Sequence, residues 1–216
     1  MSRRPLRTFA YGHPWFYHLV TAISALPVGG PQQLRQLCAQ RLAPRLPAQA
    51  AVLDLCCGGG AASGPLLARG FRVTGLDCSR EALDRAARAC PGLITVQGLA
   101  EQPPLAPGQF AGVQISLALH EFHRPARLAL LKAALGLLQP GGWFVALDLH
   151  PTHGLLGWPQ QWFVRLFETD AAVDFLTSNL AADLTMVGYG SVAVETLAMG
   201  SLQLVGARKP SPSPVP

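Results

Sequence analysis

Two acidic residues and a group of glycines follow short apolar runs in the first half of the chain. The segment VLDLCCGGG (residues 52–60) contains Asp54 and ends in three glycines, and the segment VTGLD (residues 73–77) ends in Asp77. Glycines let a backbone adopt positive φ and approach a ligand closely. A carboxylate about 20 residues further on can accept hydrogen bonds from a ribose. These two segments therefore predict a nucleoside-binding strand–turn–helix–strand unit.

Three more titratable residues follow later apolar runs. The segment QISLALHEFH (residues 114–123) places His120 just after a predicted strand, and WFVALDLH (residues 143–150) ends with Asp148 and His150. Ligands of open α/β sheets bind beyond the carboxyl ends of the strands. An imidazole that titrates near neutrality can take a proton from an acceptor there. We therefore predict His120, Asp148 and His150 as candidate catalytic residues. For His120 the alternative is a helix-start or loop histidine that bonds the backbone.

The two glycine and acid segments resemble motifs I and II of the class I S-adenosylmethionine-dependent methyltransferases. The usual first motif is D-x-G-x-G-x-G, and here Cys56 replaces the first glycine while Gly58 and Gly60 are kept. The spelling LDLCCG is similar to the quinone C-methyltransferases of the menaquinone, ubiquinone and phylloquinone pathways. The resemblance covers residues 9–209. It implies a Rossmann-like α/β fold, with a mostly parallel seven-stranded sheet, helices on both faces and a C-terminal antiparallel hairpin.

The resemblance also implies how S-adenosylmethionine, and its product S-adenosylhomocysteine, would bind. Asp54 is expected to interact with the cationic amino end of the ligand, directly or through water, and Asp77 with the two ribose hydroxyls. The remaining residues of the predicted cofactor site are Cys56, Gly58, Gly60, Cys78, Leu99, Ala100 and Ser116. Leu99 stands where the family usually has the aspartate that meets the adenine amino group. We therefore expect backbone groups around Leu99 to hold the adenine, and a lower cofactor affinity than is typical.

The acceptor is predicted to be a hydrophobic or aromatic small molecule. Aromatic residues at 9–17 and 158–167 flank the nucleotide core and favour an apolar pocket, so a quinol ring carbon is one hypothesis. The chain lacks the Asn/Asp-Pro-Pro-aromatic sequence and the Pro-Cys pair of nucleic-acid methylases, so we expect no nucleic-acid acceptor. A nicotinamide-dependent oxidoreductase remains one alternative, because it would use the same glycines and acid. A non-catalytic S-adenosylmethionine-binding protein is the other, because Leu99 departs from the motif.

Composition favours one globular domain. The chain has 216 residues, of which 50% are hydrophobic and 13% charged. It has no apolar run long enough to predict a transmembrane helix, and its basic start lacks the features of a signal peptide. Five cysteines and six histidines without ligand spacing predict reduced thiols and no metal. We expect a cytoplasmic monomer or homodimer, and the net charge of +5 leaves peripheral contact with an anionic membrane open.

Alternating patterns predict the elements that would position these residues. We place strands near 50–55, 71–76, 93–97, 110–116 and 142–149, and helices near 14–26, 31–42, 61–69, 79–89 and 124–138. Two β-rich runs, 191–197 and 201–207, predict a hairpin with which an ordinary dinucleotide fold would not end. The expected units are an N-terminal helical lead or lid (1–46), the methyltransferase domain (47–208) and a disordered Pro/Ser tail (209–216).

Overall fold

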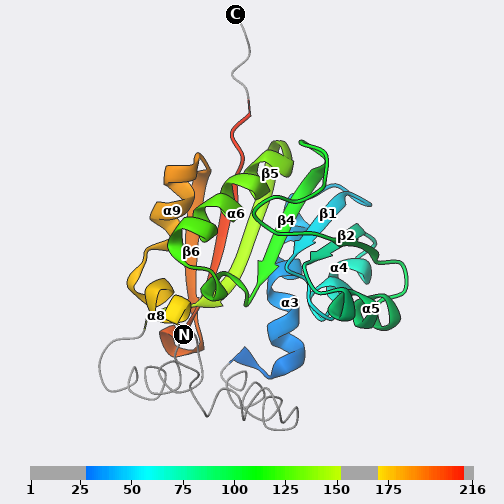
Figure 1. Cartoon of the computed structure of the whole chain (residues 1–216), viewed down its shortest axis with the longest axis horizontal. Helices are drawn as coiled ribbons and strands as arrows, with labels where there is room; N and C mark the ends of the chain where they lie inside the picture. The colour runs from blue at the N-terminus through cyan, green and yellow to red at the C-terminus, as the bar shows by residue number, and fades with distance from the viewer. Residues whose placement is uncertain (1–27, 152–169, 212–216) are drawn as a thin grey trace, which may run out of the picture.

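The computed structural model describes residues 28–151 and 170–211. The predicted helix at 14–26, both aromatic segments and most of the predicted tail lie outside these residues. The described residues form a seven-stranded sheet in the order β3-β2-β1-β4-β5-β7-β6 (Figure 1). Its strands are β1 (Ala51–Leu55), β2 (Arg72–Asp77), β3 (Ile94–Gln97), β4 (Phe110–Ser116), β5 (Leu138–Leu149), β6 (Gly190–Leu197) and β7 (Leu202–Arg208).

Strands β1 to β5 pair in parallel, and β7 lies antiparallel between β5 and β6. The mostly parallel fold and its terminal hairpin are thus confirmed. Residues in such a sheet are apolar on both faces because helices cover both. Val52 and Leu53, for example, point to opposite faces of β1, and both are fully buried.

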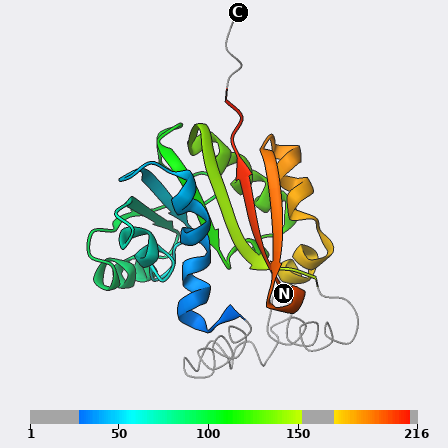
Figure 2. The same ribbon diagram turned by 180° about the vertical axis from the view of Figure 1, so that it is seen from behind.

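Six helices accompany the sheet in the described residues: α3 (Pro31–Leu42), α4 (Ser63–Leu67), α5 (Arg80–Ala89), α6 (Arg124–Leu137), α8 (Asp170–Thr177) and α9 (Leu180–Val187). Helices α3 and α4 pack with Val52 on one face, and α6, α8 and α9 pack with Leu53 on the other. Figure 2 shows α3 lying across the sheet on the side away from α6. None of the described helices is long and apolar enough to span a bilayer.

Local sequence explains the boundaries of α5 and α9. The side chain of Ser79 accepts a hydrogen bond from the backbone N–H of Ala82 and caps α5, as an N-cap serine should. Asn179 caps α9 in the same way, and Gly188 ends that helix at φ 111°. The predicted helix at 61–69 is shorter than expected, since α4 covers only five residues.

The start of β5 differs from the prediction. The Pro140-Gly141-Gly142 sequence was expected to separate a helix from a strand beginning at 142, but β5 already begins at Leu138. Its pairing with β4 shifts register between the Phe110–Leu138 pair and the Gly112–Trp143 pair. The glycines therefore form an irregularity inside the strand, where a side chain on Gly142 would approach the Ala111 carbonyl oxygen to 3.0 Å.

The strand order reverses between β1 and β4. In open α/β sheets this switch point opens a crevice beyond the carboxyl ends of the two strands. Three segments leave the sheet at this edge: the glycine loop after β1, the segment with the short 3₁₀ helix η3 (Leu119–Glu121) after β4, and the end of β5. The topology thus gathers the predicted chemistry at one edge.

Candidate active site

Asp77 closes the glycine loop at the carboxyl end of β2. Its Oδ2 accepts a hydrogen bond from the Gly58 backbone N–H at 2.9 Å, and its Oδ1 accepts one from the Ser79 N–H at 2.9 Å. Each carboxylate oxygen carries two lone pairs and can accept a further bond. The Asp77 carboxylate is therefore oriented by the backbone and keeps the capacity to receive a pair of hydroxyl groups.

The loop after β1 is twisted by three residues with positive φ: Cys56 at 60°, Gly58 at 51° and Gly60 at 81°. A Cβ built on Gly58 would meet no atom within 4 Å, whereas one on Gly60 would lie 3.1 Å from Cys90 Sγ and 3.2 Å from Ala86 Cβ. Gly60 therefore lets α5 approach the loop. Gly58 instead faces open space, so a bound cofactor could approach its backbone closely.

Asp54 lies beneath this loop and is only 1% exposed. Its Oδ2 accepts a hydrogen bond from Ser63 Oγ at 2.5 Å, which ties β1 to the first residue of α4. Burial, with a smaller contribution from Asp77, raises the pKa of Asp54 to about 6, although contacts with Ser63 and Gln114 oppose the change. The predicted contact of Asp54 with a ligand stays a prediction. The sequence alone did not identify Ser63 and Gln114 as partners of Asp54. The pairing of β1 with β4 places Gln114 opposite Asp54.

The predicted adenine side lies beyond β2 and β3. The side chain of Leu99 is 59% exposed, whereas Ala100 is buried. A turn closed by the hydrogen bond from the Gln102 N–H to the Leu99 carbonyl, at 3.2 Å, holds this segment. Cys78 is exposed beside it, and Ser116 is half-buried at the end of β4. Leu99 thus presents an apolar side chain on which a flat ring can pack.

His120 and Asp148 form a buried pair at the ends of β4 and β5. His120 Nδ1 lies 2.5 Å from Asp148 Oδ1. The backbone N–H groups of Leu119 and Leu149 donate to the same carboxylate at 2.7 and 2.8 Å. Because an ionised carboxylate only accepts hydrogen bonds, Nδ1 carries the proton in this contact. In the neutral imidazole Nε2 is then the basic nitrogen.

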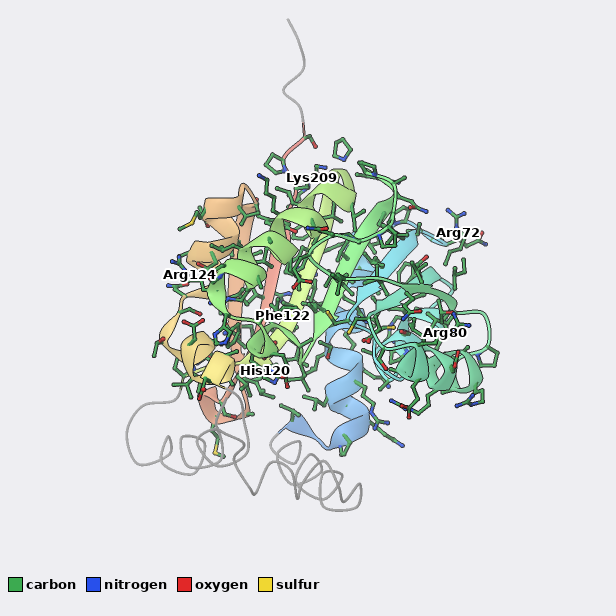
Figure 3. The ribbon with its side chains drawn as sticks, viewed as in Figure 1. Arg72, Arg80, His120, Phe122, Arg124 and Lys209 are labelled. Atoms are coloured by element: carbon green, nitrogen blue, oxygen red, sulfur yellow. The ribbon has the colours of Figure 1, made fainter. Side chains whose placement is uncertain are left out.

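The third candidate, His150, makes a different contact. Its Nδ1 lies 2.8 Å from the Gly200 carbonyl oxygen, and its backbone N–H donates to Ser201 at 2.9 Å. Both contacts fasten the end of β5 to the turn between β6 and β7, the 3₁₀ helix η4 (Ala198–Gly200). The structure therefore brings His120 and Asp148 together and gives His150 a backbone partner. In Figure 3, His120 and Phe122 lie at the edge where β4 ends.

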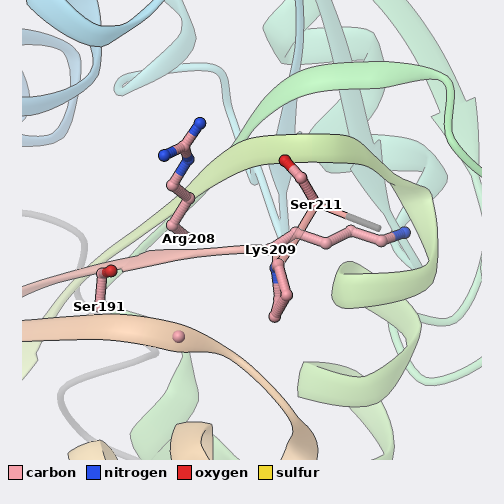
Figure 4. Close-up of a pocket in the computed structure, with 6 residues that line it drawn as sticks. Ser191, Arg208, Lys209 and Ser211 are labelled. Atoms are coloured by element: carbon pink, nitrogen blue, oxygen red, sulfur yellow. The ribbon is translucent and has the colours of Figure 1, made fainter. Parts of the chain in front are cut away.

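A cavity of about 270 Å³ lies at the opposite end of the hairpin, lined by Gly190, Ser191, Arg208, Lys209, Pro210 and Ser211 (Figure 4). Its two cations already have partners: Arg208 Nε donates to the Gly141 carbonyl at 3.0 Å and Lys209 Nζ to the Leu138 carbonyl at 2.7 Å. These two hydrogen bonds attach the end of β7 and the residue after it to the irregular start of β5. Within the described residues, no group of three or more His, Cys, Asp or Glu side chains is arranged to hold a metal ion.

Comparisons with known proteins identify methyltransferases as relatives of this chain. The family described as a methyltransferase domain matches residues 52–142. An uncharacterized methyltransferase of Synechocystis sp. is 42% identical over 204 residues, covering 94% of this chain and 95% of that protein. The 2-phytyl-1,4-naphtoquinone methyltransferase of Thermosynechococcus vestitus is 36% identical over 128 residues, 56% of each chain.

Solved structures share the fold. Phosphoethanolamine N-methyltransferase 2 of Haemonchus contortus, in complex with S-adenosylmethionine, has a TM-score of 0.71 at 15% identity over 95% of this chain and 60% of that one. An S-adenosylmethionine-dependent methyltransferase of Methanosarcina mazei has a TM-score of 0.60 at 20% identity, covering 78% and 96% of the two chains. Because one relative is 42% identical over 94% of this chain, the chain belongs to the class I S-adenosylmethionine-dependent methyltransferases. This membership sets aside the oxidoreductase and the non-catalytic alternative.

Proposed function

We propose that this methyltransferase acts on a hydrophobic aromatic small molecule and that the acceptor atom is a ring carbon of a quinol. The observation that carries the proposal is the contact of 2.5 Å between His120 and Asp148 at the mouth of the sheet. Transfer of a methyl group from a sulfonium needs mainly in-line placement and exclusion of water. A buried and oriented imidazole at this edge therefore supports an acceptor that must lose a proton. The partial likeness to a naphthoquinone methyltransferase supports a quinol.

The loop residues fit the cofactor. We infer that Asp77 binds the ribose hydroxyls with its remaining lone pairs, and that the open backbone at Gly58 lies beside the amino-acid end. Leu99 packs against the adenine in this proposal, and Asp54 and Ser63 support the loop from below. When bound, S-adenosylmethionine supplies an activated methyl group at the switch point of the sheet.

The chain's own residues would then move one proton. His120 Nε2 accepts the proton of a quinol hydroxyl, and Asp148 stabilises the resulting imidazolium through Nδ1. The Leu119 and Leu149 amides keep the Asp148 carboxylate in place during this step. Negative charge delocalises from the quinol oxygen to the ring carbon, which takes the methyl group as the bond between that group and the sulfonium sulfur breaks and leaves S-adenosylhomocysteine. The ring C–H proton is then released to water, and the ring recovers its aromaticity. The His120 imidazolium returns its proton to the quinol oxygen, so the net reaction releases one proton.

The proposal is tested by incubating the purified enzyme with S-adenosylmethionine and reduced, prenylated naphthoquinones or benzoquinones that lack one ring methyl group. We expect a product heavier by one methylene, detected by mass spectrometry. His120→Gln and Asp148→Asn should slow the reaction about 100-fold or more, as loss of a general base does. His150→Gln serves as the matched control. Wild-type turnover with an unaffected His120→Gln variant would refute the role of the pair, and no turnover of any quinol would refute the acceptor class.

A further inference from the structure

A buried guanidinium lies behind the segment that carries His120. Arg127, in α6, is fully buried although it carries a charge. Its Nη1 donates a hydrogen bond to the Phe122 carbonyl at 3.0 Å. Phe122 directly follows η3, so this bond anchors the end of the short segment whose middle residue is His120. The His120 segment is thus held by Asp148 on one side and by Arg127 on the other.

Two acids from the helices that follow surround Arg127. Its Nε lies 3.5 Å from Asp183 Oδ2 in α9, and its Nη1 lies 3.6 Å from Asp174 Oδ2 in α8. The guanidinium carbon also stands 5.1 Å from the centre of the Phe175 ring. Arg124 completes the cluster, because its Nη2 lies 2.8 Å from Asp183 Oδ1. Two arginines are therefore balanced by two aspartates.

Burying the charged guanidinium of Arg127 costs free energy, because the charge loses its hydration. Among the described residues, Arg127 Nε and Nη2 and Asp183 Oδ2 are buried without a well-formed hydrogen bond. A buried ion pair often stabilises a fold no better than apolar side chains of similar volume. Core filling therefore does not explain the guanidinium. The distinct contribution of Arg127 is a directional bond to the backbone beside His120.

We propose that Arg127 is a positioning residue for the reaction. By fixing the Phe122 carbonyl, it keeps η3 in place, so that His120 Nδ1 stays hydrogen-bonded to Asp148 and Nε2 remains the basic nitrogen. This inference rests on the proposed function only in taking His120 as the base. Without the anchor, η3 can shift away from Asp148, and the imidazole loses the partner that selects its tautomer.

The test compares Arg127→Met, Arg127→Lys and a matched control, Arg124→Gln, in the full-length chain. The first readout is the tautomer of His120, measured by long-range ¹H–¹⁵N NMR and assigned by its absence in His120→Gln. The second is the kinetics of methyl transfer to the reduced prenylated naphthoquinone, together with the affinity for S-adenosylhomocysteine from calorimetry.

We expect Arg127→Met to convert His120 from the Nδ1–H form to a mixture of tautomers. Its kcat should fall by about tenfold or more, while KM and S-adenosylhomocysteine affinity change little. Arg127→Lys should recover part of both losses, and Arg124→Gln should leave both near wild type. A wild-type tautomer and kcat in Arg127→Met would overturn the proposal.

The tautomer readout needs no acceptor, so it decides the role of Arg127 even if the wild-type enzyme methylates no quinol. If Arg127→Met does not fold, the double variant Arg127→Met/Asp183→Asn takes its place, since it also neutralises the buried carboxylate that would lose its partner. A wild-type tautomer in this double variant would then overturn the proposal.

Discussion

Replacing Asp54 by Asn should stabilise the protein at alkaline pH. Asp54 is 1% exposed, and burial is the main cause that raises its pKa from 3.8 to about 6. The folded protein therefore holds this proton to a higher pH than the unfolded chain does. Below about pH 4 both states are protonated and no penalty arises. Above about pH 6 both are ionised, and the folded state carries the whole cost of the buried charge.

The size of this cost follows from the two pKa values. One pKa unit corresponds to about 1.4 kcal/mol, so a rise from 3.8 to about 6 removes at most about 3 kcal/mol from the free energy of unfolding at pH 8. Asparagine has nearly the same shape and its carbonyl can still accept the Ser63 hydroxyl. Asp54→Asn should thus raise the free energy of unfolding by up to about 3 kcal/mol at pH 8, which corresponds to roughly 6–12 °C in Tm. At pH 4 it should change the free energy of unfolding little.

Urea unfolding followed by circular dichroism at pH 4, 5, 6 and 8 measures this effect. The matched control is Asp84→Asn in α5, which removes a carboxylate that is 50% exposed and pairs with Arg80 at 3.2 Å. This control should change stability by less than about 1 kcal/mol at every pH. Equal effects of Asp54→Asn at pH 4 and pH 8, or a loss of stability at pH 8, would refute the reasoning. Calorimetry with S-adenosylhomocysteine shows separately whether the Asp54 charge contributes to cofactor binding.

Three further predictions concern the loop and its support. Asp77→Ala should remain folded but lose about 10- to 100-fold in affinity for S-adenosylhomocysteine, and an unchanged Kd would show that the ribose site is elsewhere. Gly58→Ala and Gly70→Ala should each cost about 1 kcal/mol in urea unfolding, because both glycines have positive φ and open surroundings, but only Gly58→Ala should weaken binding. Gly75→Ala should cost about 1–3 kcal/mol, because its Cβ would lie 2.8 Å from Cys57 Sγ. Adding Cys57→Ala should recover part of that loss, and strictly additive losses would contradict this packing.

Much of the fold could be predicted from local pattern. Apolar runs that end in glycine or acid marked β1 and β2, and Ser79 marked the start of α5, because a capping side chain acts over three residues. The terminal hairpin followed from two β-rich runs with a short link. The predicted start of β5 near residue 142 was wrong, because pairing with β4 extends the strand through residues that by themselves favour a turn.

The candidate site likewise combines features that local sequence predicts with contacts that only the folded structure shows. The sequence by itself determined the glycine loop, Asp77 and the family, since these depend on residue types at short spacing. Only the tertiary structure decided that His120 meets Asp148, 28 positions away, while His150 turns to Gly200. It also decided that Asp54 lies beneath the loop and that Arg127 is buried behind His120. These contacts join strands and helices that are far apart in the sequence. They depend on strand order, which is decided when long crossover connections pack the elements together and not by neighbouring residues in the chain.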